Sequence, residues 1–186
     1  MSPRPTTAPT PTAVPRWPLV PLLLAVPLIL AAISQLPVTM NREVHSVQLP
    51  QSVDRMALFF GYVDCPAVCP TTMSALRQVY LQYSEDPERA SLGVTFVNLA
   101  PPSGAQVADY AAHFHPDFFG LQANAADRGA FMRELGVRFD RSAAGPAGWH
   151  TDSIYLLRRE AAVWRVRRVV RSPIEPQQVV ALLQEI

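Results

Sequence analysis

The sequence of 186 residues contains no lysine, and all sixteen of its basic residues are arginine. Fifteen acidic residues nearly balance them and leave a net charge of +1. A chain so close to neutral offers no basic surface large enough to collect phosphates, so we expect no nucleic-acid partner. We attribute the absence of lysine to coding bias. The arginine-rich stretch 165–168 (RVRR) alternates with apolar residues and is predicted to be the solvated face of a strand.

Charge is also missing from the region between Arg16 and Arg42, in which residues 17–33 are almost wholly apolar. Such a run can cross the roughly 30 Å hydrocarbon core as one helix, so we predict a transmembrane anchor at residues 17–36. Basic but no acidic residues precede it, which places the amino terminus in the cytoplasm and the rest of the chain in the periplasm, at the inner membrane. A cleaved signal peptide with a long leader is the alternative.

The remaining chain divides by composition. Residues 1–16 are mostly Pro, Thr and Ala, which predicts a disordered cytoplasmic N-terminus. Residues 37–55 are polar and irregular and are predicted to be a linker. Residues 56–186 are long enough for one domain of ordinary size.

Within residues 56–186, apolar runs typical of strands alternate with amphipathic segments typical of helices. We predict strands at 56–62, 92–99 and 118–121, and a hairpin of 153–157 and 163–170 with its turn around 158–160. We predict helices at 71–83, from 103 or 104 to about 113, at 125–135 and at 176–186. This order favours a three-layer α/β domain with a mixed sheet.

Cysteine is scarce: only Cys65 and Cys69 occur, four positions apart. A disulfide across so short a loop constrains little chain entropy, which favours a reactive pair over a structural bridge. Cys69 lies at the predicted helix entrance, where the helix dipole lowers a thiol pKa, so we expect it to be the more acidic thiol. Thioredoxin-type oxidoreductases separate their cysteines by two residues. The wider spacing here leaves room for a metal ion.

No second Cys or His pair with a spacing comparable to that of Cys65 and Cys69 is present, and a structural zinc site would usually require one. Soft thiolates with one imidazole favour copper. Of the four histidines, His45 lies in the predicted linker, and His113 and His115 flank a helix end in a capping or solvated position. His150 follows a loop rich in small residues and precedes a buried strand. It is the candidate third ligand, although a lone histidine before a strand is usually structural.

The segments GYVDCPAVCPTT (61–72) and WHTDSIYLL (149–157) together resemble the Sco/SenC family of copper-binding, cytochrome c oxidase assembly proteins. The resemblance covers residues 56–186 and implies a thioredoxin-like domain behind a membrane anchor. It also implies that Cys65, Cys69 and His150 hold one copper ion as Cu(I); Cu(II) would need a further oxygen or nitrogen ligand. The implied activity is that of a metallochaperone. The implied partner is the copper-bearing subunit of cytochrome c oxidase or another periplasmic copper protein.

Three features depart from the family pattern. An Asp-Pro-x-x-Asp stretch usually follows the second strand, but residues 98–103 (NLAPPS) contain neither acid. The residue before the ligand histidine is commonly Asp, but here it is Trp149, and Asp152 follows instead. The hairpin before the first core strand is shortened.

Two other functions fit the same residues. An exported thiol-disulfide oxidoreductase or redox sensor would use Cys65 and Cys69 without metal. A non-catalytic interaction module would keep only the fold.

Overall fold

The computed structural model describes residues 25–26, 41–45, 49–100, 107–140 and 149–186, without the side chains of Asp140, Trp149 and His150. The chain divides into two units, Met1–Val38 and Thr39–Ile186, and the fold given below is that of the second. The predicted N-terminus (1–16) and nearly all of the predicted anchor (17–36) lie outside the described residues. Among the residues that are described, no helix is both long and apolar enough to cross a membrane.

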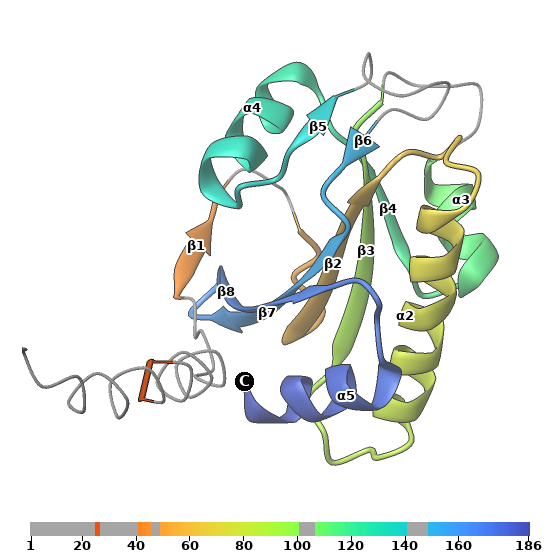
Figure 1. Cartoon of the computed structure of the whole chain (residues 1–186). Helices are drawn as coiled ribbons and strands as arrows, with labels where there is room; N and C mark the ends of the chain where they lie inside the picture. Colours follow the sequence, from red (N-terminus) through yellow and green to blue (C-terminus); the bar gives the residue numbers. More distant parts are fainter. Residues whose placement is uncertain (1–24, 27–40, 46–48, 101–106, 141–148) are drawn as a thin grey trace, which may run out of the picture. The chain divides into compact units, whose positions relative to one another are not determined.

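Six strands form a mixed sheet in the order β1-β8-β7-β2-β3-β4 (Figure 1). These strands are β1 (Arg42–Val44), β2 (Arg55–Gly61), β3 (Leu92–Asn98), β4 (Phe119–Gln122), β7 (Ser153–Glu160) and β8 (Val163–Arg171). The helices around them are α2 (Val68–Ser84), α3 (Val107–Phe114), α4 (Ala125–Glu134) and α5 (Pro176–Glu185). Strands β2, β3 and β4 run parallel, whereas β7 is antiparallel to β2 and β8. The predicted α/β class and mixed sheet are confirmed.

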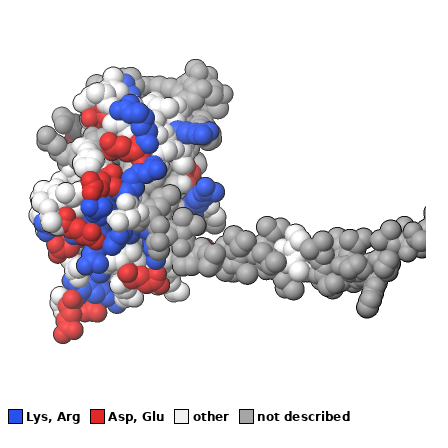
Figure 2. Space-filling model, turned by 90° about the vertical axis from the view of Figure 1, so that its left-hand side faces the viewer, with Lys and Arg blue, Asp and Glu red and all other residues white. Residues whose placement is uncertain are grey.

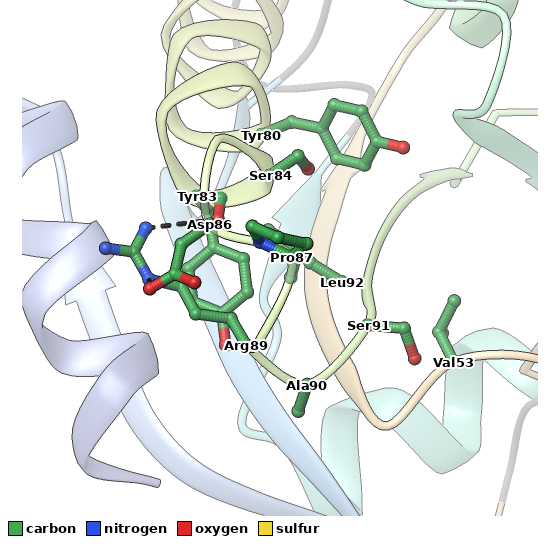
Figure 3. Close-up of a pocket in the computed structure, with 10 residues that line it drawn as sticks. All are labelled: Val53, Tyr80, Tyr83, Ser84, Asp86, Pro87, Arg89, Ala90, Ser91 and Leu92. Carbon is green, nitrogen blue, oxygen red and sulfur yellow. Dashed lines mark hydrogen bonds and ion pairs between the residues drawn. The ribbon is translucent and has the colours of Figure 1, made fainter.

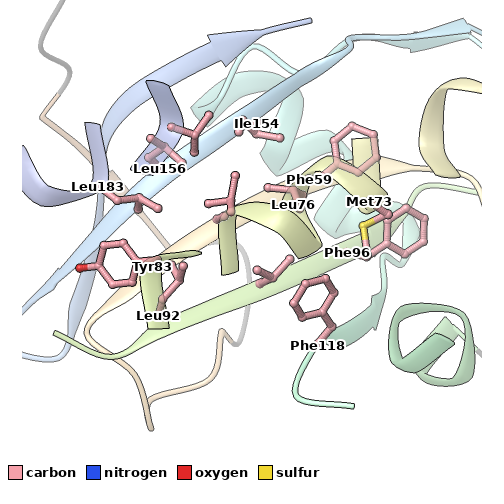
Figure 4. Close-up of a cluster of buried hydrophobic side chains, with 14 of the residues drawn as sticks. Phe59, Met73, Leu76, Tyr83, Leu92, Phe96, Phe118, Ile154, Leu156 and Leu183 are labelled. Carbon is pink, nitrogen blue, oxygen red and sulfur yellow. The ribbon is translucent and has the colours of Figure 1, made fainter. Parts of the chain in front are cut away.

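Both faces of β2 are buried, and its side chains alternate between two apolar clusters. Phe59 lies in one cluster with Met73 and Leu76 of α2 and Leu183 of α5 (Figure 4). Ala57 belongs to the same cluster, as does Ala111 of α3. Leu58 and Phe60 pack on the other face with Phe131 of α4. Because parallel strands that are covered on both faces have no wet side, the sequence shows a continuous apolar run here. Helices therefore lie on both faces of the sheet, as a three-layer domain requires.

Helix α2 begins at Val68, three residues before the predicted start. Cys69 therefore lies inside its first turn rather than at its entrance. Pro70 is tolerated there because the first-turn N–H groups have no partner within a helix. The early start also turns these N–H groups toward the preceding cysteine loop.

The hairpin of β7 and β8 is longer than predicted, and its turn lies at Ala161 and Ala162 rather than at residues 158–160. Both alanines have positive φ, 47° and 70°. Two-residue turns of this kind normally use Asn and Gly, so the alanines carry no recognisable signal. Arg159 stays in the strand because its backbone N–H donates to the Asp54 carbonyl at 2.9 Å and its guanidinium pairs with the Asp54 carboxylate at 2.6 Å.

Two further elements differ from the predictions. The segment expected to be an irregular linker contributes β1, which pairs with β8, and buries Val44 and Leu49. The segment expected to be a loop before the hairpin begins and ends with short strands, β5 (Phe139–Asp140) and β6 (Trp149–His150), which pair with each other. Such short strands are defined by their partners and leave no periodic pattern in the sequence.

Three arginines of β8, at positions 165, 167 and 168, are paired with acidic side chains. Arg165 pairs with Glu43 of β1 and with Glu160, and Arg167 pairs with Glu160 at 2.9 Å. Between them Val166 is buried. Blue and red side chains interleave on the face shown in Figure 2. The prediction that residues 165–168 form the solvated face of a strand is confirmed only in part: the side chains of Arg165 and Arg167 are 26% and 28% exposed, whereas that of Arg168 is 15% exposed and its Nε is buried.

Candidate thiol site

The two cysteines meet at the carboxyl end of β2 and the amino end of α2. The backbone N–H of Cys69 donates to the Sγ of Cys65 at 3.4 Å, and the Cys69 thiol is hydrogen-bonded to the same sulfur. Both residues are thiols in the structure. Cys65 is half-buried, whereas Cys69 is 0 % exposed. The pair therefore has one sulfur that a partner can reach and one held in the core.

Cys65 is the more acidic of the two thiols. Burial alone would oppose its ionisation, but the backbone N–H groups of Cys69, Ala67 and Val68 and the Cys69 thiol point at its sulfur. Together they hold the pKa of Cys65 below its ordinary value. The first turn of α2 thus acts on the cysteine that precedes it, because that sulfur faces the unpaired N–H groups.

Cys69 behaves in the opposite way. Burial raises its pKa well above the ordinary value, against the effect of the Tyr62 backbone N–H, and the hydrogen bond to Cys65 and the negative charges of Cys65 and Asp152 raise it further. The expectation that Cys69 would be the more acidic thiol is therefore wrong. Desolvation in the core outweighs the helix dipole.

Gly61, the last residue of β2, provides the space in which the Cys69 sulfur lies. A Cβ at this position would be 2.6 Å from the Cys69 Sγ and 3.0 Å from the Phe96 ring. Both distances are shorter than normal packing allows. Gly61 is a site residue that we did not predict, and its signal is a glycine at the carboxyl end of a buried aromatic strand.

A network of two side-chain amides, the buried Asn98 of β3 and the exposed Gln122 of β4, supports the cysteine loop. The Asn98 Oδ1 accepts from the Val63 backbone N–H at 3.3 Å, and its Nδ2 donates to the Gln122 Oε1 at 2.8 Å. Gln122 in turn donates to the Ala100 carbonyl at 2.7 Å. Asn98 is 1 % exposed and stands where relatives are expected to carry an acid. An amide can both donate and accept there, so the loop is tied without a buried charge.

The segment that carries His150 is anchored next to the cysteines. In β6 the backbone of His150 pairs with Phe139; its side chain lies outside the described part of the structure. Two residues further on, the Asp152 carboxylate accepts from the Thr72 hydroxyl at 3.4 Å. Thr72 lies one turn beyond Cys69 in α2. The structure thus ties the His150 segment to the cysteine helix.

The other three histidines have partners elsewhere. His45 pairs with Glu43 at 3.0 Å, the His115 Nδ1 accepts from the Asp117 backbone N–H at 3.2 Å, and His113 lies edge-on to Phe114. Across the described residues, no group of three His, Cys, Asp or Glu side chains is placed to hold a metal ion.

A cavity of about 290 Å³ lies at the opposite end of the sheet, between the end of α2 and the start of β3 (Figure 3). Its one arginine, Arg89, pairs with Asp86 at 3.3 Å and donates to the Gln82 and Tyr83 carbonyls at 3.1 Å. The guanidinium of Arg89 is therefore already paired within the protein. The thiol pair remains the candidate site.

A parallel β2-α2-β3 unit, continued by an antiparallel hairpin and carrying two thiols at the strand-to-helix junction, defines a thioredoxin-like domain with a thiol site. The family model of SCO1/SenC matches residues 49–185, and the chain belongs to this family.

Relatives and solved structures agree with this assignment. The mitochondrial SCO2 homolog of Bos taurus is 30% identical over 109 residues, 54% of this chain and 40% of that protein. The chain spans about two fifths of the length of the first curated relatives that it matches. The crystal structure of Arabidopsis thaliana ScoI with copper bound has a TM-score of 0.60 at 18% identity, covering 71% of this chain and 83% of that one. BsSco, a member of the Sco family of cytochrome c oxidase assembly proteins, has a TM-score of 0.57 at 12% identity, covering 81% and 96%. These two likenesses concern the fold.

Proposed function

We propose that this protein is a copper metallochaperone that binds one copper ion through Cys65, Cys69 and His150 and serves the assembly of the copper centre of cytochrome c oxidase. The observation that carries the proposal is the contact between the two sulfurs at the junction of β2 and α2. Two sulfurs this close form a soft donor set, which suits Cu(I). Copper is the cargo here rather than a resident cofactor.

The unequal burial of the thiols suits uptake and release. Binding of Cu(I) displaces one proton from each thiol, and the lowered pKa of Cys65 makes its proton the easier to lose. An acceptor thiolate would replace the half-exposed Cys65 before the buried Cys69. The Thr72–Asp152 contact would hold the His150 segment near the sulfurs during this exchange.

The same asymmetry favours a second function, thiol-disulfide reduction. The Cys65 thiolate would attack a substrate disulfide, form a mixed disulfide and release one substrate thiolate. Cys69 would then attack the Cys65 sulfur, lose its proton, and release the second substrate thiol. The substrate gains two electrons, and the protein is left with a Cys65–Cys69 disulfide.

Copper titration of the reduced full-length protein in detergent, against a Cu(I)-specific chelator, tests the first function. We expect one copper per chain, and in each of Cys65→Ser, Cys69→Ser and His150→Ala a loss of affinity at least as large as the roughly 10–100-fold that removal of a residue supporting a metal ligand costs. His113→Ala, which changes an exposed histidine at the end of α3, is the matched control and should bind as the wild type does. If His150→Ala keeps full affinity and still reduces disulfides, the metallochaperone function is rejected in favour of the reductase.

We also propose that residues 17–36 anchor the protein in the inner membrane with residues 37–186 in the periplasm. The uncharged stretch between Arg16 and Arg42 supports this. A membrane-impermeant maleimide should label Cys65 in intact spheroplasts treated with a copper chelator. Labelling that requires lysis would place the domain in the cytoplasm.

A further inference from the structure

The hydroxyl of Tyr110 in α3 is buried and, within the part of the chain that the structure describes, has no hydrogen-bond partner. Such groups are rare in folded proteins, because a buried hydroxyl that has lost its water is costly. A buried donor without a partner is a candidate for a hydrogen bond that forms in another state of the protein.

The Tyr110 side chain is one ring away from the buried sulfur. Its ring packs on Phe96 with centroids 4.8 Å apart. The Phe96 ring in turn lies beside the Cys69 Sγ, since both lie within 3.0 Å of the position that a Cβ on Gly61 would occupy. Tyr110 packs against the same apolar cluster as Cys65, and that cluster contains Cys69.

The pKa of Tyr110 also indicates that its hydroxyl lies near the two sulfurs. The pKa of Tyr110 is raised first by burial and then by negative charge on Cys69 and on Cys65. A thiolate that disfavours the ionised oxygen favours a protonated O–H directed at it. A neutral thiol is only a weak acceptor, so the hydroxyl gains little until a sulfur is ionised.

We propose that Tyr110 is a positioning residue whose hydroxyl donates a hydrogen bond to the Cys69 sulfur when copper binding has removed the thiol proton. The inference rests on the proposed copper function. In the metal-free thiol state the hydroxyl stays unpartnered, and copper binding supplies its acceptor. The bond would hold the buried sulfur in place while Cys65 exchanges with a partner.

The test compares Tyr110→Phe with the wild type as reduced full-length proteins in detergent. Removing the hydroxyl should weaken Cu(I) binding by about 10-fold, the scale of one hydrogen bond to a charged acceptor. It should also shift the sulfur-to-Cu(II) charge-transfer band. The melting temperature of the metal-free protein should stay the same or rise, because the variant loses a buried group that had no partner.

Tyr155→Phe is the matched control. The Tyr155 hydroxyl donates to the Leu135 carbonyl at 3.2 Å on the opposite face of the sheet. This variant should lower the melting temperature and leave copper affinity unchanged.

Each contrary result is distinct. A Tyr110→Phe protein with wild-type copper affinity and an unchanged charge-transfer band overturns the role of Tyr110 and leaves the copper function standing. A fall in the melting temperature of metal-free Tyr110→Phe like that of Tyr155→Phe also overturns it, because the hydroxyl would then be bonded at rest. A wild-type protein that binds no copper overturns the proposed function itself.

Discussion

The Cys69 sulfur occupies the space that a side chain at Gly61 would fill, since a Cβ on Gly61 would lie 2.6 Å from it. The end of β2 and the start of α2 therefore pack against each other through the contact of Gly61 with the Cys69 Sγ. This contact places the buried thiol and fixes where the second sulfur can lie, because the Cys69 backbone N–H donates to Cys65.

Gly61→Ala should displace the Cys69 sulfur and overpack the core. We expect a loss of about 1–3 kcal/mol in the free energy of unfolding, measured by urea titration, together with weaker copper binding. Gly129→Ala in α4 is the control: its nearest contact is the flexible Arg133 Nη1 at 3.3 Å. This change should stabilise the protein by about 0.5–1 kcal/mol. Equal effects of the two substitutions would show that the Cys69 sulfur can move away at no cost.

The thiols should differ in reactivity in the reduced, metal-free protein. Iodoacetamide should modify Cys65 first and remain effective below the ordinary thiol pKa of about 8.5, because the pKa of Cys65 is lowered. Cys69 should react only when the protein unfolds, since it is buried and its pKa is raised. Peptide mass spectrometry after timed quenching measures both rates. Faster modification of Cys69 in the folded state would contradict this assignment.

The stability of the reduced, metal-free protein should fall as pH rises above about 8.5. The folded protein keeps the proton on Cys69, whose pKa is raised, while the unfolded chain releases it, so unfolding is favoured by alkali. Cys65 acts with the opposite sign, because its lowered pKa adds stability up to the pKa of the unfolded thiol. Tyr155, whose pKa is raised by burial to about 12, adds to this loss only above the ordinary tyrosine pKa of about 10.

The variant Cys69→Ala distinguishes the contribution of Cys69 to the pH dependence from those of Cys65 and Tyr155. In urea titrations at a series of pH values, it should remove the first part of the alkaline loss, whose limit is about 1.4 kcal/mol per pH unit for one proton. Cys65→Ala should not remove it. A wild-type unfolding free energy that is constant from about pH 8 to pH 10 would be incompatible with a protonated, buried Cys69.

Asn98→Ala should remove the hydrogen bond that holds the cysteine loop to β3. It removes the acceptor for the Val63 and Ala100 backbone N–H groups, of which the Ala100 N–H is buried and would be left unsatisfied. We expect a loss of about 1–3 kcal/mol in unfolding free energy and faster alkylation of Cys69 in the folded protein. Gln177→Ala, on the exposed surface of α5, should change neither quantity. If Asn98→Ala destabilises the fold without exposing Cys69, the network supports the sheet rather than the site.

The sequence by itself determined the parts of this protein that are encoded locally. The continuous apolar run of β2 follows from burial on both faces, and the helical periodicity of α2 follows from one buried face. The proximity of Cys65 and Cys69 could be predicted because they lie four positions apart, between the end of a strand and the start of a helix. The mixed sheet followed from the order of these elements.

The tertiary structure decided what depends on distant partners. β1 exists because Arg42–Val44 pairs with β8, and the positive φ of Ala161 and Ala162 is imposed by the register of the strands they join. The relative acidity of the thiols was decided in the same way. Helix position alone favoured Cys69, but its place in the core makes charge on it costly. The N–H groups that stabilise a thiolate face Cys65 instead, because α2 starts at Val68.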